Sequence, residues 1–183
     1  PTEGSLHSNQ QNLSLTSSET FPRPEDTKSP RGVYEYTVEN IDLDDGEKIT
    51  ITAGERVVFY VKGNINGAIE HDCSSVTEPT VCKPGNLQIY ADNGSGSPNP
   101  QICLKGNQTL QAFIFAPDYS LGKTDNGTFI GAAWGKNWGQ ISGCLSSSGA
   151  VAVTQGVEWT ELIYDLKPQF PRLGQIANWC EEP

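Results

Sequence analysis

The sequence has no methionine, few charged residues and no long hydrophobic run. Charged residues make up 19% of the 183 residues and hydrophobic residues 36%, and the apolar positions do not recur at the spacing of amphipathic helices. These absences argue against a helical bundle and against a membrane-spanning helix. Because the sequence begins with Pro1 instead of methionine, we expect a mature or trimmed chain, with any membrane attachment through a segment upstream of it.

Basic residues are scarce as well. There are 12 lysines and arginines against 22 aspartates and glutamates, which gives a net charge of −10. An acidic chain repels nucleic acid phosphates and anionic lipid headgroups. The bulk charge therefore argues against a nucleic-acid-binding protein and against electrostatic docking on a membrane.

Turn-forming residues are plentiful, with 19 glycines and 12 prolines. Short apolar runs separated by such residues are typical of a β protein. We expect residues 33–43 and 48–52 to form strands joined by a hairpin-type turn at 44–47. Further strands are expected at six more apolar runs: 56–63, 86–94, 101–107, 111–118, 127–135 and 149–155.

The first part of the chain differs from the rest. Residues 1–31 are rich in serine, threonine, glutamine and proline and contain few apolar side chains. Such a segment buries too little surface to offset its ordering entropy. We therefore expect residues 1–31 to be a linker or a loosely draped arm, and residues 32–183 to form a single β domain.

The tripeptide Lys-Gly-Asn occurs twice, at residues 62–64 and 105–107. We interpret both copies as corners, in which Gly63 and Gly106 adopt positive φ and Asn64 and Asn107 bond the backbone of a neighbouring coil. Similar turns recur with a period near 20 residues, which favours a short right-handed parallel β-helix-like solenoid. The N-terminal strands and the C-terminal coil would cap it. A β-sandwich is the alternative architecture.

Five cysteines occur, none in a CxxC pair, so the common zinc spacings are absent. We expect an exported protein with one or two disulfides and one remaining thiol, instead of a cytosolic protein with reduced, buried cysteines. Cys73 is expected to pair with Cys82 across a short loop. Cys144 is expected to pair with Cys180, although spacing alone does not fix the connectivity.

The sequence offers little for catalysis. Glu70, His71 and Asp72 are adjacent residues, and we expect them to lie in a solvated loop, because catalytic groups normally come from separated positions. No nucleophile elbow, zinc-protease or nucleotide-binding motif occurs. We therefore expect no enzyme activity and no cofactor or metal. A carbohydrate-active alternative would need a cluster of carboxylates, for which Glu70, Asp72 and Asp118 are the candidates.

Two tryptophans stand in a glycine-rich segment, Trp134 and Trp138 within GAAWGKNWG. Exposed indole rings stack on sugars or on a protein partner, so both residues are candidate contacts with a ligand or a partner. The alternative is that both rings pack against the protein itself, as tryptophan does on average.

Several segments together resemble a known family. They are GNLQIYADNG, QICLKGNQTLQAFIFAPD, GTFIGAAWGKNW and the late VEWTELIYDL with FPRLGQIANW. The resemblance is to an uncharacterised, β-helix-like domain of exported bacterial proteins, mainly cyanobacterial, found downstream of type IV pilin-like or PilX-like N-termini. Residues 33 to about 139 carry most of it.

The resemblance implies an extracellular or cell-surface protein linked to type IV pili, as a minor pilin or an adhesive accessory component. Its partners would be pilus subunits or other surface proteins, with glycans as a further candidate. Two alternatives remain beside this non-enzymatic role. One is a carbohydrate-binding or polysaccharide-active β-helix protein, and the other is a scaffold that self-assembles end to end.

Overall fold

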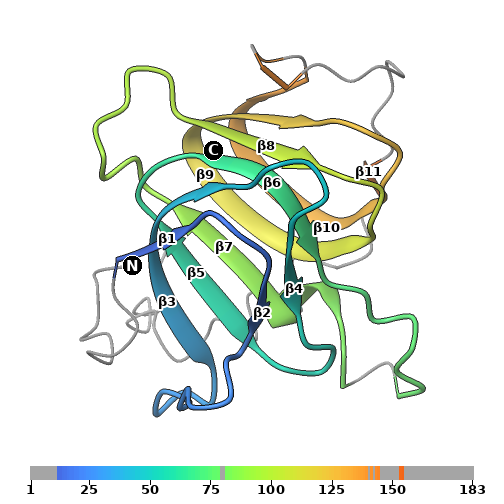
Figure 1. Cartoon of the computed structure of the whole chain (residues 1–183). Coiled ribbons are helices and arrows are strands. Elements are labelled where there is room, and N and C mark those ends of the chain that lie inside the picture. The colour runs from blue at the N-terminus through green and yellow to red at the C-terminus, as the bar shows by residue number, and fades with distance from the viewer. Residues whose placement is uncertain (1–11, 79–80, 140, 142, 145–152, 155–183) are drawn as a thin grey trace, which may run out of the picture.

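The computed structural model describes residues 12–78, 81–139, 141, 143–144 and 153–154 (Figure 1). Its elements are strands and one 3-10 turn, which confirms the predicted all-β class. The strands are β1 (Leu13–Leu15), β2 (Glu19–Phe21), β3 (Tyr34–Asp42), β4 (Lys48–Ile51), β5 (Val57–Val61), β6 (Ile65–Glu70), β7 (Leu87–Ala91), β8 (Gln101–Lys105), β9 (Leu110–Lys123), β10 (Phe129–Trp138) and β11 (Val153–Thr154), with η2 (Pro84–Asn86) before β7. The predicted C-terminal cap lies outside the described residues.

All ladders between the named strands are parallel, and most join a strand to the one two places along the chain. One row runs β1-β3-β5-β7-β9 and the other runs β2-β4-β6-β8-β9. An additional pairing of β3 with β6 closes β3, β5, β7, β9, β8 and β6 into a barrel-like ring. Figure 1 shows β3, β5 and β7 side by side, with the long β9 curving past them.

The hairpin expected at residues 33–52 does not form. β3 pairs with β1, β5 and β6, whereas β4 pairs with β2 and β6, so the two strands belong to different rows. The turn between them, closed by a bond from Glu47 N to Asp44 O, carries the chain from one row to the other. A corner and a hairpin use the same turn residues, which is why the sequence did not separate them.

Strand β9 belongs to both rows. Its residues 113–115 pair with β7, and its residues 120–123 pair with β8. Pro117 lies between the two paired stretches, where the missing amide hydrogen breaks no ladder bond. The sequence predicts a strand over residues 111–118, which would end just after Pro117. In the structure the strand continues and only its partner changes.

The core consists of the side chains that point between the rows. They alternate with outward-facing residues along each strand, as expected for strands with one buried face. At one end, the rings of Phe21, Tyr36 and Phe59 pack edge to face with centroid distances of 4.7, 5.2 and 5.7 Å. All three rings are fully buried.

Residues 12–31 do not form the linker or loosely draped arm that the sequence predicts. The three-residue strands β1 and β2 extend the two rows by pairing with β3 and β4, and Leu15 and Phe21 enter the core. Each short strand thus contributes one buried side chain and one parallel ladder, and the Tyr36 hydroxyl donates a further bond to Asp26 at 2.6 Å. Residues 1–11 lie outside the described part of the chain.

Both Lys-Gly-Asn segments are corners. The Asn64 side-chain oxygen accepts a hydrogen bond from the Gln101 amide, and that of Asn107 accepts one from the Asn126 amide, each at 3.0 Å. These bonds to the next turn of the chain match the expectation. The backbone of Gly106 has φ 91°, also as expected.

Gly63 does not have the expected positive φ. It is needed for a different reason, because a Cβ there would collide with the Glu39 carbonyl oxygen and the Asn40 side chain. The Asn40 oxygen is fixed in that position by the bond it accepts from the Asn64 amide at 2.9 Å.

Replacing Gly63 with alanine should lower the free energy of unfolding by about 1–3 kcal/mol, the usual cost of overpacking a fixed contact. Gly94→Ala is the matched control, since the atoms nearest to its Cβ would belong to the Asp92 and Lys62 side chains, at 3.2–3.4 Å. Urea denaturation measures both variants. Equal stability of the two would show that the corner at Gly63 yields to a methyl group.

Within the described residues, no helix has the length and hydropathy needed to cross a membrane.

Candidate functional site

Four aromatic side chains form a row across neighbouring strands, which we call the outer aromatic row. It consists of Tyr60 on β5, Tyr90 on β7, Phe115 on β9 and Trp134 on β10, each in register with the next. Successive ring centroids lie 5.8, 6.4 and 6.3 Å apart. Because their strand neighbours point into the core, these rings lie on the outer face of the sheet.

The Tyr60 end of the row is polar. The Tyr60 hydroxyl donates to Glu35 at 3.1 Å, and Glu35 also pairs with Arg31. At the next ring, the Tyr90 hydroxyl donates to the Gln88 side-chain oxygen at 3.0 Å. Burial raises the pKa of both phenols, so they remain neutral donors at physiological pH.

The other end of the row is open to solvent. Trp134 has 54% of its surface exposed, the highest value among the large apolar side chains of the described residues. Trp138 lies differently: it is half-buried, packs against the core, and its ring centroid lies 5.9 Å from that of Phe129. The two tryptophans that the sequence groups together thus have separate environments, one exposed to solvent and one packed against the core.

The sequence does not reveal the rest of this row. Tyr60, Tyr90 and Phe115 each stand in an apolar run that sequence analysis assigns to a strand. Aligning those runs in parallel register would have placed the three rings beside Trp134. The parallel pairing itself is the missing information, since no short motif encodes it.

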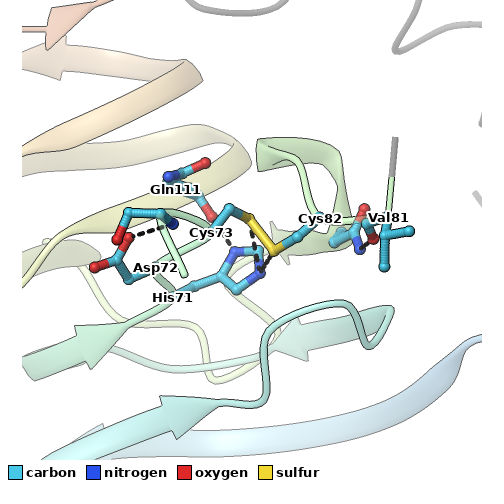
Figure 2. The surroundings of a disulfide bond; sticks show 8 residues. His71, Asp72, Cys73, Val81, Cys82 and Gln111 are labelled. Atoms are coloured by element: carbon cyan, nitrogen blue, oxygen red, sulfur yellow. Dashed lines mark hydrogen bonds between the residues drawn. A yellow bond between two sulfur atoms is a disulfide. The ribbon is translucent and has the colours of Figure 1, made fainter. Parts of the chain in front are cut away.

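A second cluster of side chains surrounds the disulfide between Cys73 and Cys82 (Figure 2). His71 follows β6, forms a bridge with Leu110, and is completely buried. The expected solvated loop is therefore wrong at this residue. Burial lowers the pKa of the His71 imidazole, whereas a hydrogen bond to the Gln111 carbonyl acts in the opposite direction. The ring is accordingly neutral at physiological pH.

The imidazole lies against sulfur. His71 Nε2 is 3.5 Å from the sulfur of Cys82 and 3.8 Å from that of Cys73. Figure 2 shows the ring beside the disulfide that joins these two cysteines. The disulfide between Cys73 and Cys82 is the pairing that the sequence predicts. It closes a loop whose ends are nine residues apart.

The second disulfide differs from the prediction. Cys144 pairs with Cys103 on β8, 41 residues earlier, instead of with Cys180. Both sulfurs are buried beside Ile141. Cys180 lies outside the described residues. The two disulfides are compatible with an exported or extracellular protein.

The three candidate carboxylates do not gather into one site. Glu70 forms an ion pair with Lys48, Asp72 accepts a bond from the Ser74 amide at 2.9 Å, and Asp118 lies exposed on β9. Among the described residues, the group of potential ligands that does come together is His71, Cys73 and Cys82. The carboxylate cluster required by the polysaccharide-active alternative is therefore not formed by these three residues.

Residues 35–142, more than half of the chain, match the family described as "Domain of unknown function (DUF7305)". The matched range nearly coincides with residues 33–139, which carry the resemblance found in the sequence. No curated protein and no solved structure matches the chain.

Proposed function

The chain belongs to the DUF7305 family of domains of unknown function, and we propose that it is a non-enzymatic, exported domain that binds other proteins at the cell surface. In this proposal it works with type IV pili, as a minor subunit or an adhesive accessory component. The observation that carries the proposal is the outer aromatic row with its exposed end at Trp134.

The row has the composition of a contact surface. Aromatic side chains provide large contact areas at low cost in conformational entropy, and they are enriched where proteins bind one another. The parallel ladders hold the rings at fixed spacing, so little order has to be gained on binding. Arg31, which is partly exposed and paired with the buried Glu35 beside Tyr60, would supply a polar contact at that end of the row.

The proposed architecture is a short right-handed parallel β-helix. The pairing of each strand with the strand two places along supports it, as do the Asn64 and Asn107 side chains that bond the next turn. A right-handed winding follows the general rule for parallel crossovers. Such a stack would present one side of every turn as a continuous surface for a partner.

Trp134→Ala should abolish the association of the exported protein with surface filaments without altering its fold. The measurement is to shear filaments from cells that make the protein and to probe the filament, envelope and medium fractions. Val81→Ala is the matched control, because Val81 is also exposed, at 46%, but lies outside the row. Circular dichroism of the purified variants checks the fold.

Different failures have different meanings. If the wild-type chain stays in the envelope or in the medium, the pilus role is wrong. If the wild-type chain and the Trp134→Ala variant both travel with the filaments, the aromatic row is not the contact surface. Binding of the purified protein to a glycan array, lost in Trp134→Ala, would replace the protein partner with a carbohydrate.

A further inference from the structure

The strongest unassigned feature is the cluster of His71, Cys73 and Cys82. Each residue contributes one potential metal ligand, and these atoms all lie within 4.8 Å of one another. They come together from two chain segments, since Cys82 returns to His71 after the loop that follows Cys73 (Figure 2). His71 is completely buried, and Cys82 is 5% exposed.

The hydrogen bond of His71 determines which nitrogen can bind a metal. Nδ1 lies 2.5 Å from the Gln111 carbonyl oxygen, which can only accept, so Nδ1 must carry the proton. Nε2 therefore has its lone pair free, and it is the atom nearest to both sulfurs. An imidazole whose second nitrogen donates to a carbonyl is the common arrangement of histidine ligands in metal sites.

The distances also fit a tetrahedral ion. Zinc bonds of about 2.3 Å to sulfur and 2.05 Å to nitrogen place these ligand atoms about 3.6 Å apart. The two separations from Nε2 to sulfur are 3.5 and 3.8 Å. The sulfurs would have to move to about 3.8 Å from each other. The exposed residues 74, 75, 77 and 78 of the intervening loop leave room for such a movement.

We propose that His71, Cys73 and Cys82 bind Zn²⁺ when their disulfide is reduced. A phosphine reductant transfers two electrons to the disulfide, which breaks the S–S bond, and becomes a phosphine oxide by taking the oxygen of one water molecule. The two hydrogens of that water protonate the two sulfurs, which gives two thiols. Zinc then displaces the two thiol protons, forms two bonds to the thiolates, and accepts the Nε2 lone pair. Water occupies the fourth position, as in zinc sites with three protein ligands.

The consequence is that one loop has two alternative cross-links. In the oxidised protein a covalent bond joins Cys73 and Cys82. In the reduced protein a zinc ion would hold the same two residues together and add His71 to them. The cross-link in use would depend on the redox state and on the zinc supply of the compartment.

The test titrates the full chain with Zn²⁺ against a chromophoric chelator, before and after reduction with the phosphine. We expect one equivalent to bind only after reduction. The Cys103→Ala/Cys144→Ala variant should still bind it, and Cys73→Ala/Cys82→Ala should not. His71→Gln should weaken binding by roughly 100-fold, because losing a ligand costs at least as much affinity as losing a residue that supports one.

Two outcomes would overturn the proposal. One is equal zinc binding by the oxidised and the reduced protein. The other is undiminished binding by the reduced Cys73→Ala/Cys82→Ala variant, which would locate the metal elsewhere. If His71→Gln does not fold, Co²⁺ replaces zinc in the reduced wild-type chain. Absorption bands of a cobalt–thiolate complex are then expected, and their absence would reject thiolate ligation.

Discussion

Replacing Phe21 with alanine should lower the free energy of unfolding by about 3–5 kcal/mol, the usual cost of removing a buried phenylalanine ring. The effect is large because the ring is fully buried and packs edge to face against Tyr36 and Phe59, at 4.7 and 5.2 Å. Its loss leaves a cavity between β2 and the neighbouring strands, which the fixed parallel ladders cannot close.

Denaturation in guanidinium chloride measures this effect. Thr20→Ala is the matched control, because Thr20 lies on the same short strand but is exposed, and we expect its change to stay within about 0.5 kcal/mol. If Phe21→Ala and Thr20→Ala were equally stable, residues 19–21 would be an arm without a role in the core, as the sequence composition suggests.

Removing the Cys103–Cys144 disulfide by a double substitution to alanine should cost about 4 kcal/mol. This value follows from the entropy of closing a loop in the unfolded chain, since the two residues are 41 positions apart. The same substitution of Cys73 and Cys82 opens a loop whose ends are only nine positions apart and should cost about 2.5 kcal/mol. The longer loop is therefore expected to give the larger loss of stability.

Thermal or guanidinium unfolding of the two double variants gives the comparison. Peptide mapping without reduction provides an independent check, because it identifies the cysteine joined to Cys144. A peptide that links Cys144 to Cys180 would contradict the structure. Equal losses in the two variants would contradict the loop-length argument.

The sequence predicts the class of the fold and several of its details. Short apolar runs between glycine, proline and asparagine indicate strands, and most of these runs are strands in the structure. The Lys-Gly-Asn corners were also predictable, because glycine and asparagine favour turns, although the amides that bond Asn64 and Asn107 lie 37 and 19 residues later. The Cys73–Cys82 pair follows from a short loop in the same way.

Features that depend on distant partners could not be predicted. The strands around Leu15 and Phe21 are three residues long and acquire their role only by pairing with β3 and β4. His71 is buried, and its ring bonds the carbonyl of Gln111, 40 residues later. The partner of Cys144 is Cys103 because β9 and β10 return the chain to β8, a path that no spacing rule contains.

The Cys103–Cys144 bond has a mechanical consequence. A pull on the two ends of this chain would pass through the sulfur bridge and bypass the 41-residue interval between the two cysteines. That interval, which includes β9, β10 and Trp134, would otherwise add roughly 140 Å of length on extension. Under tension this interval could not be extended, so the strands outside the bridge would carry the load and Trp134 would stay within the bridged segment.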